Sequence, residues 1–137
     1  ISYNNQLWIT GRSINGRQFW SSEDGENWEE IISSSPLPNR SRQQLLNYSD
    51  RLWLIGGYNR SNVEENDIFS SMDGENWQLE TEHADFPARE DFKLTVFNET
   101  LYLTGGRGPK DNAGTVWRSP DGINWKKLYR LPINLSD

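Results

Sequence analysis

Ser71-Met72-Asp73-Gly74-Glu75-Asn76-Trp77 decides the fold, because the same Ser-x-Asp-Gly-x-x-Trp pattern also occurs at residues 22–28 and 119–125. The aspartates of successive copies are 49 and then 48 residues apart. A period of about 50 residues with an aromatic residue at a fixed offset indicates one supersecondary unit that is repeated. The pattern therefore predicts a solenoid or a propeller, and it predicts that residues found in every copy are architectural.

Each repeat contains four short β-type runs that are separated by turn signals. An apolar run that ends at glycine comes before each copy, at residues 7–11, 52–57 and 101–106. An aromatic residue precedes each aspartate by four positions: Trp20, Phe69 and Trp117. No segment has a helical period over the ten or more residues that a helix needs. Four antiparallel strands per unit with glycine and aromatic signatures are typical of a propeller blade.

The sequence therefore predicts an all-β propeller with three four-stranded antiparallel blades in this chain. The predicted blades are residues 1–36 with an incomplete first strand, 37–85, and 86–137, which includes the start of the next blade's connector. Propellers have about four to eight blades, so we expect this chain to form about half of a six-bladed ring. A second copy in head-to-tail contact or the remaining blades of a longer polypeptide would complete it, and the sequence leaves both open.

The repeated motif has a mechanical interpretation as a turn. We expect the aspartate to accept backbone N–H bonds, the glycine to take a positive φ, and the tryptophan to begin the outermost strand and pack against a sheet. The predicted structural residues are Asp24, Gly25, Trp28, Asp73, Gly74, Trp77, Asp121, Gly122 and Trp125. The alternative is a calcium loop that includes Asp24, Glu26 and Asn27, but Ile123 replaces the acidic residue in the third copy.

Composition excludes several function classes. The formal net charge of −6 argues against nucleic acid or an anionic membrane as the partner. The absence of cysteine excludes disulfides, a thiol nucleophile and a zinc–thiolate site, and we expect neither a metal nor a cofactor. Five sequons favour a secreted or cell-surface protein, with a surface protein that carries no glycan as the alternative. The candidate glycosylation sites are Asn39, Asn47, Asn59, Asn98 and Asn134.

A ligand is expected on the face that carries the loops between strands two and three and the connectors between blades. These loops differ in length between repeats, whereas the Asp-Gly turns of the opposite face do not, and variable loops on a rigid scaffold carry binding sites. The candidate ligand residues are Arg40, Arg42, Tyr58, Arg60, Arg89, Asp91 and Arg107. Arg40 and Arg89 have an alternative interpretation as structural residues that pair with neighbouring blades.

The Gly-Gly pairs, the strand-opening aromatic residues and Pro-x-Arg at 38–40 and 87–89 resemble kelch repeats over essentially the whole chain. The turn motif is similar to the Asp-box of sialidases, and the combination resembles secreted galactose-oxidase-like propellers. The resemblance implies a site for an acidic peptide or a glycan, and because few catalytic residue types are present we expect a non-enzymatic binding scaffold. A sialidase-type or other glycosidase is the alternative: Glu90 or Asp91 could supply one of its two carboxylates, and Arg40, Arg89 and Arg107 are candidates to bind the carboxylate of the substrate. His83 is the only histidine, so a Ser-His-Asp site could form only there.

Overall fold

Three antiparallel β-sheets form the structure, a computed structural model that describes residues 1–11, 19–34, 37–109 and 114–130. Within these residues no helix occurs, so none is long and apolar enough to cross a membrane. The first sheet contains β1 (Ser2–Tyr3), β2 (Gln6–Thr10), β3 (Phe19–Ser22) and β4 (Glu29–Ile31). The third contains β10 (Lys93–Phe97), β11 (Thr100–Thr104), β12 (Thr115–Ser119) and β13 (Lys126–Arg130).

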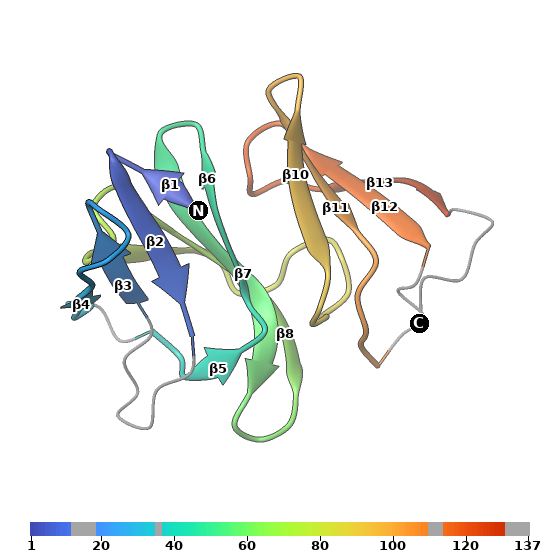
Figure 1. Cartoon of the computed structure of the whole chain (residues 1–137). Helices are drawn as coiled ribbons and strands as arrows, with labels where there is room; N and C mark the ends of the chain where they lie inside the picture. Colours follow the sequence, from blue (N-terminus) through green and yellow to red (C-terminus); the bar gives the residue numbers. More distant parts are fainter. Residues whose placement is uncertain (12–18, 35–36, 110–113, 131–137) are drawn as a thin grey trace.

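The second sheet has a first strand in two parts, β5 (Arg40–Ser41) and β6 (Gln44–Tyr48), which both pair with β7 (Arg51–Asn59). β8 (Glu64–Ser71) and β9 (Trp77–Thr81) complete it. The break falls at Arg42, which has a φ of 57°. Each sheet thus has the predicted four strand positions in chain order, and the three sheets lie side by side as blades 1, 2 and 3 (Figure 1). The blade boundaries after residues 36 and 85 remain predictions, and residues 131–137 lie outside the described part.

The Ser-x-Asp-Gly-x-x-Trp turn has the same hydrogen bonds in all three blades. In blade 2, Asp73 Oδ1 accepts the backbone N–H groups of Glu75 and Asn76 at 2.9 and 2.7 Å. The hydroxyl of Ser71 accepts the N–H of Gly74 at 2.8 Å, and Gly74 has a φ of 80°. The indole N–H of Trp77 donates to the Gly74 carbonyl. The aspartate and glycine therefore close the turn as the sequence predicted, and the tryptophan is fixed at the entrance to the last strand.

Adjacent blades are joined by aromatic residues that fit onto these turns. The Trp8 ring of blade 1 lies on Gly74, where an added Cβ would be 2.2 Å from Trp8 Cη2. The Trp53 ring of blade 2 lies in the same way on Gly122 of blade 3, where a Cβ would come within 2.7 Å. Only glycine leaves room for these rings. The invariant glycine of the turn is therefore an inter-blade contact as well as a turn residue.

Two tyrosines add hydrogen bonds across the same interfaces. The Tyr3 hydroxyl lies 2.9 and 2.7 Å from the carbonyl oxygens of Asp50 and Met72 in the next blade. The Tyr48 hydroxyl repeats this arrangement one blade further on, with the carbonyls of Glu99 and Pro120. Burial separates into two cores, one between blades 1 and 2 and one between blades 2 and 3. Each core is an inter-blade interface, so no blade buries its aromatic residues alone.

The prediction that the motif tryptophan begins the last strand is wrong in two repeats, because Trp28 and Trp125 precede β4 and β13, which begin at Glu29 and Lys126. Trp28 also differs in burial: it is 38% exposed, whereas Trp77 and Trp125 are 7% and 5% exposed. The local hydrogen bonds are the same, because its indole N–H reaches the Gly25 carbonyl at 3.2 Å. The difference is that a preceding blade covers Trp77 and Trp125, and no other described blade covers Trp28.

Candidate functional site

The candidate site is a group of charged and aromatic side chains from blades 2 and 3, which we call the mouth cluster: Arg42, Tyr58, Glu90, Asp91 and Arg107. Arg42 and Asp91 hold equivalent repeat positions, and both have left-handed backbones with φ of 57° and 55°. Glu90 forms an isolated antiparallel bridge with Arg107, with N–H···O distances of 2.8 and 2.9 Å. The backbone therefore fixes these residues against one another, although they come from different loops.

The twin glycines that end the second strands make this close approach possible. Gly106 has a φ of 94°, and an added Cβ would lie 2.9 Å from the Glu90 carbonyl oxygen and 2.9 Å from Phe92 Cβ. A residue with a side chain would push the connector that carries Glu90 and Asp91 away from β11. The Gly-Gly pair in the sequence is thus the feature that positions the mouth cluster.

Four charged side chains of the cluster form one ionic network. Arg42 Nη1 donates to Glu90 Oε2 at 2.6 Å and lies 3.8 Å from Asp91 Oδ2. Arg107 Nη2 donates to Asp91 Oδ2 at 2.5 Å and lies 3.8 Å from Glu90 Oε1. The two arginines thus share both carboxylates, and the network brings blades 2 and 3 together.

The cluster remains accessible despite these contacts. The side chains of Arg42 and Arg107 are 49% and 62% exposed, whereas that of Glu90 is only 9% exposed. The hydrogen bond and the charge of Glu90 raise the pKa of Arg42 above its usual value, so it is a permanent cation. Arg42 also lies over the Tyr58 ring, 5.9 Å from the centroid. A ligand would therefore meet two fixed guanidinium groups and an aromatic face, with the carboxylates behind them.

Arg40 and Arg89 lie below this surface, contrary to their inclusion among the ligand residues. Arg40 is buried, forms an ion pair with Asp67 and donates to the Gly56 carbonyl at 3.1 Å. Arg89 is fully buried and donates to the Gly105 carbonyl at 2.8 Å. Burial lowers the pKa of Arg89 to about 10, which leaves it charged at neutral pH. The two arginines are therefore structural, but these contacts hold equivalent strand ends of their own blades, 2 and 3, and not the neighbouring blades that the alternative interpretation expected.

Arg60 is the remaining predicted ligand residue. It is exposed and lies beside Tyr58 in a shallow groove whose other lining residues are Asn39, Arg40, Ser41, Asn59 and Asn62. Tyr58 thus adjoins both this groove and Arg42. Of the seven predicted ligand residues, four lie in the mouth cluster, one lies next to it and two are buried beneath it.

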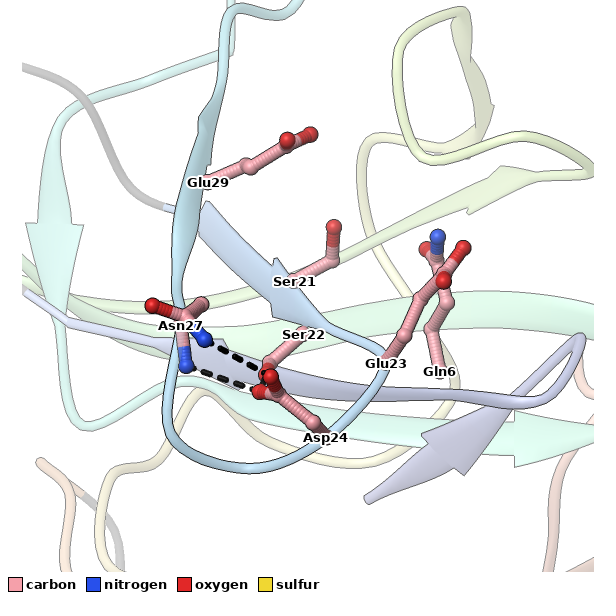
Figure 2. A pocket seen from close by; sticks show the side chains of 7 residues that line it. All are labelled: Gln6, Ser21, Ser22, Glu23, Asp24, Asn27 and Glu29. Atoms are coloured by element: carbon pink, nitrogen blue, oxygen red, sulfur yellow. Dashed lines mark hydrogen bonds between the residues drawn. The ribbon is translucent and has the colours of Figure 1, made fainter.

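A second hollow, which sequence reasoning missed, lies on the outer part of blade 1 (Figure 2). Its lining residues are Gln6, Ser21, Ser22, Glu23, Asp24, Asn27 and Glu29. Figure 2 shows Asp24 turned toward Asn27, to which it is bound through the backbone N–H at 2.8 Å and the side-chain amide at 2.7 Å. Asp24 is thus occupied by its own turn. The one feature of the sequence that points to this hollow is a pair of acidic residues, Glu23 and Glu29, at positions that are not acidic in the other repeats.

The alternative sites from the sequence gain no geometric support. Within the described residues, no group of three or more His, Cys, Asp or Glu side chains could hold a metal ion, and both carboxylate oxygens of Asp24 already accept N–H groups of its own turn. His83 is exposed in the segment after β9, and its backbone N–H bonds to the hydroxyl of Thr81 at 3.3 Å.

The described sequons differ in how available their amides are. Asn47 and Asn98 are exposed, and Asn98 lies in the tight turn between β10 and β11. Asn39 is half-buried. The Asn59 side chain accepts the N–H groups of Ser61 and Val63 and donates to Glu65, so its amide already closes a turn. Asn134 lies outside the described residues. The Asn47 amide donates to the Ser2 carbonyl at 3.1 Å, so Asn98 is the most available of the four described positions.

The three adjacent four-stranded blades define the class of this protein as a β-propeller. Residues 1–119 match the model of the DUF6242 beta propeller domain, and the chain belongs to that family. No curated protein matches the chain.

Proposed function

We propose that this β-propeller domain is a non-enzymatic binding scaffold whose ligand contacts the mouth cluster. The observation that carries the proposal is that Arg42 and Arg107, from different blades, are fixed by shared carboxylates and yet are 49% and 62% exposed. A guanidinium group has five N–H donors, and the ionic contacts use one nitrogen of each arginine. The remaining donors suit the carboxylates of an acidic peptide or an acidic glycan, which Arg binds with defined geometry.

The aromatic member of the cluster supports the same ligand class. Tyr58 lies between Arg42 and the groove that contains Arg60, so a bound chain could extend from the cluster into this groove. A tyrosine ring offers an apolar face to a sugar ring or a peptide side chain and a hydroxyl for hydrogen bonding. The kelch-like features of the repeats agree with a ligand on this face. A secreted or cell-surface location, which the sequons favour, would expose the cluster to such ligands.

The glycosidase alternative has a weaker geometric basis. A glycosidase needs two carboxyl groups on opposite sides of the scissile bond, one of which must be protonated. Glu90 and Asp91 are consecutive and are both held by the same two arginines, so they lie together and do not face each other across a bound substrate. We therefore expect no turnover of fluorogenic glycosides, including a sialoside. Turnover that Glu90→Gln or Asp91→Asn abolishes, with an unchanged melting temperature, would instead establish the enzyme.

An array of glutamate-rich peptides and of sialylated and neutral glycans tests the binding proposal. The wild-type chain should bind a subset of the acidic probes, and the Arg42→Gln/Arg107→Gln variant should lose at least tenfold in affinity for them. The control variant, Arg118→Gln/Lys127→Gln, removes the same charge from exposed positions on β12 and β13. If both double variants weaken binding equally, net charge and not the mouth cluster is responsible. If the wild-type chain binds no probe, the ligand class is wrong.

A further inference from the structure

The outer face of blade 1, on the side away from blade 2, carries apolar side chains, and none of the other described blades covers it. Leu7, Ile9 and Trp28 are exposed there. Their equivalents are all buried: Leu52, Leu54 and Trp77 in blade 2, and Leu101, Leu103 and Trp125 in blade 3. The buried equivalents belong to the two inter-blade cores, where a preceding blade covers them. The outer face of blade 1 therefore carries apolar residues at the same positions that blades 2 and 3 use to contact the preceding blade.

Blade 3 presents the other half of the interface on its outer face. Phe97 is 63% exposed, whereas its equivalents Tyr3 and Tyr48 are 5% and 6% exposed. Tyr102 occupies the position of the docking rings Trp8 and Trp53, and it lies beside Phe97 with a ring-centroid distance of 6.4 Å. In blades 1 and 2 the rings at these positions contact the next blade. In blade 3 there is no next blade among the described residues, and the two rings pack only on each other's edge, as Tyr48 and Trp53 also do within blade 2.

The two outer faces also complement one another at the turn glycine. Gly74 receives the ring of Trp8 and Gly122 receives the ring of Trp53. At Gly25, an added Cβ would meet only the Leu7 Cδ1 atom of its own blade, at 3.3 Å, so no ring from another blade lies on it. Trp8, Trp53 and Tyr102 occupy equivalent positions in the three blades. Of these three rings, that of Tyr102 does not lie on a turn glycine. The same geometry would place Tyr102 on Gly25.

The charges of the two end blades are opposite. Residues 1–34 contain two Lys or Arg and five Asp or Glu, a net charge of −3. Residues 93–130 contain seven Lys or Arg and three Asp or Glu, a net charge of +4. Contact between blade 1 and blade 3 would be attractive, and contact between two copies of the same blade would be repulsive. Blade 2 separates them within one chain, so the attraction favours contact between two chains.

We propose that blade 3 of one copy of this chain docks onto blade 1 of a second copy, with Tyr102 on the Gly25 turn. Two such contacts, related by a twofold axis, would close a ring of six blades, which is within the usual range for propellers. The apolar end faces would then be buried in the manner of the two interfaces inside each chain. This inference concerns the partner of the end blades and does not depend on the mouth cluster, which a single chain already contains.

Sedimentation velocity over a concentration series tests the proposal on the full chain. The wild-type chain should approach twice its mass of 15.9 kDa, whereas Ile9→Glu and Phe97→Glu should each remain single chains with unchanged circular dichroism. Leu79→Glu is the matched control, because Leu79 is an exposed apolar residue on β9 of the central blade. This variant should behave like the wild-type chain. A wild-type chain that stays at 15.9 kDa at every concentration overturns the proposal.

A mixing experiment tests the head-to-tail direction. The Ile9→Glu chain retains an intact blade 3 face, and the Phe97→Glu chain retains an intact blade 1 face. A mixture of the two should therefore form one wild-type interface and recover a 1:1 complex that neither variant forms alone. If the mixture remains monomeric while the wild-type chain is dimeric, or if either variant alone remains dimeric, the proposed contact between blades 3 and 1 is wrong.

Discussion

Replacement of Gly74 by alanine should reveal how much of the stability comes from the ring that lies on this turn. Gly74 and Gly25 occupy the same turn with nearly equal φ values of 80° and 79°. Alanine in such a left-handed conformation costs about 1–2 kcal/mol at either position. At Gly74 the new Cβ would also lie 2.2 and 2.4 Å from two ring carbons of Trp8, so the ring must move. At Gly25 it would only meet the flexible end of Leu7.

Forced displacement of a packed ring adds about 1–3 kcal/mol, as in other overpacked cores. We therefore expect Gly74→Ala to lower the free energy of unfolding by roughly 2–5 kcal/mol and Gly25→Ala by roughly 1–2 kcal/mol. The assay is urea unfolding monitored by far-ultraviolet circular dichroism, with all variants made in the Ile9→Glu background so that Gly25 stays uncovered. Equal losses at the two glycines would refute the idea that Trp8 docks on Gly74.

Three further predictions concern the same interfaces. Trp77→Ala should cost roughly 3–5 kcal/mol in the free energy of unfolding, as for a buried aromatic residue, and Trp28→Ala, at the exposed equivalent, less than about 1 kcal/mol; similar costs in urea unfolding would contradict the burial difference. Tyr48→Phe should cost about 1–3 kcal/mol, since the single hydroxyl hydrogen that lies between the carbonyls of Glu99 and Pro120 is lost, and a neutral result would contradict the bridge. The side-chain amide and backbone N–H of Asn76 lower the pKa of Asp73 from 3.8 to about 2. This stabilisation is complete above pH 3.8 and is lost as the pH falls toward 2, so urea midpoints should decrease there, and Asp73→Asn should reduce that decrease.

The fold could be predicted from the sequence because each blade repeats the residues that build it. The Asp-Gly pair specifies its turn through local hydrogen bonds alone, and these form identically in all three copies. Burial of the motif tryptophan, unlike the turn, does not follow from the local sequence. Trp28 and Trp77 have the same local sequence pattern, but only Trp77 has a blade in front of it. A repeat motif predicts local geometry, whereas burial depends on the neighbouring repeat.

The candidate site could be predicted in part, for a related reason. Arg42, Tyr58, Asp91 and Arg107 lie on one face of the blades. This could be predicted from the sequence, because in antiparallel blades the loops between strands two and three and the connectors between blades lie on the same side. The sequence pattern alone does not show which way a guanidinium group turns, and Arg40 and Arg89 turn inward to strand-end carbonyls. A signal was present, because both arginines belong to the repeated Pro-x-Arg segment, and recurrence in successive repeats is typical of architectural residues. Arg42 and Arg107 have no such recurrence.

The most direct test of the central claim is an NMR titration that observes the Nε–Hε groups of the arginines while a glutamate-rich peptide or an acidic glycan from the array is added. The account predicts that the signals of Arg42 and Arg107 shift together and saturate at one ligand per chain, while the signal of Arg51, which is bound to Ser70 on the outer part of blade 2, stays in place. Saturable binding that shifts Arg51 or other distant signals and leaves Arg42 and Arg107 unchanged would contradict the assignment of the mouth cluster as the binding site.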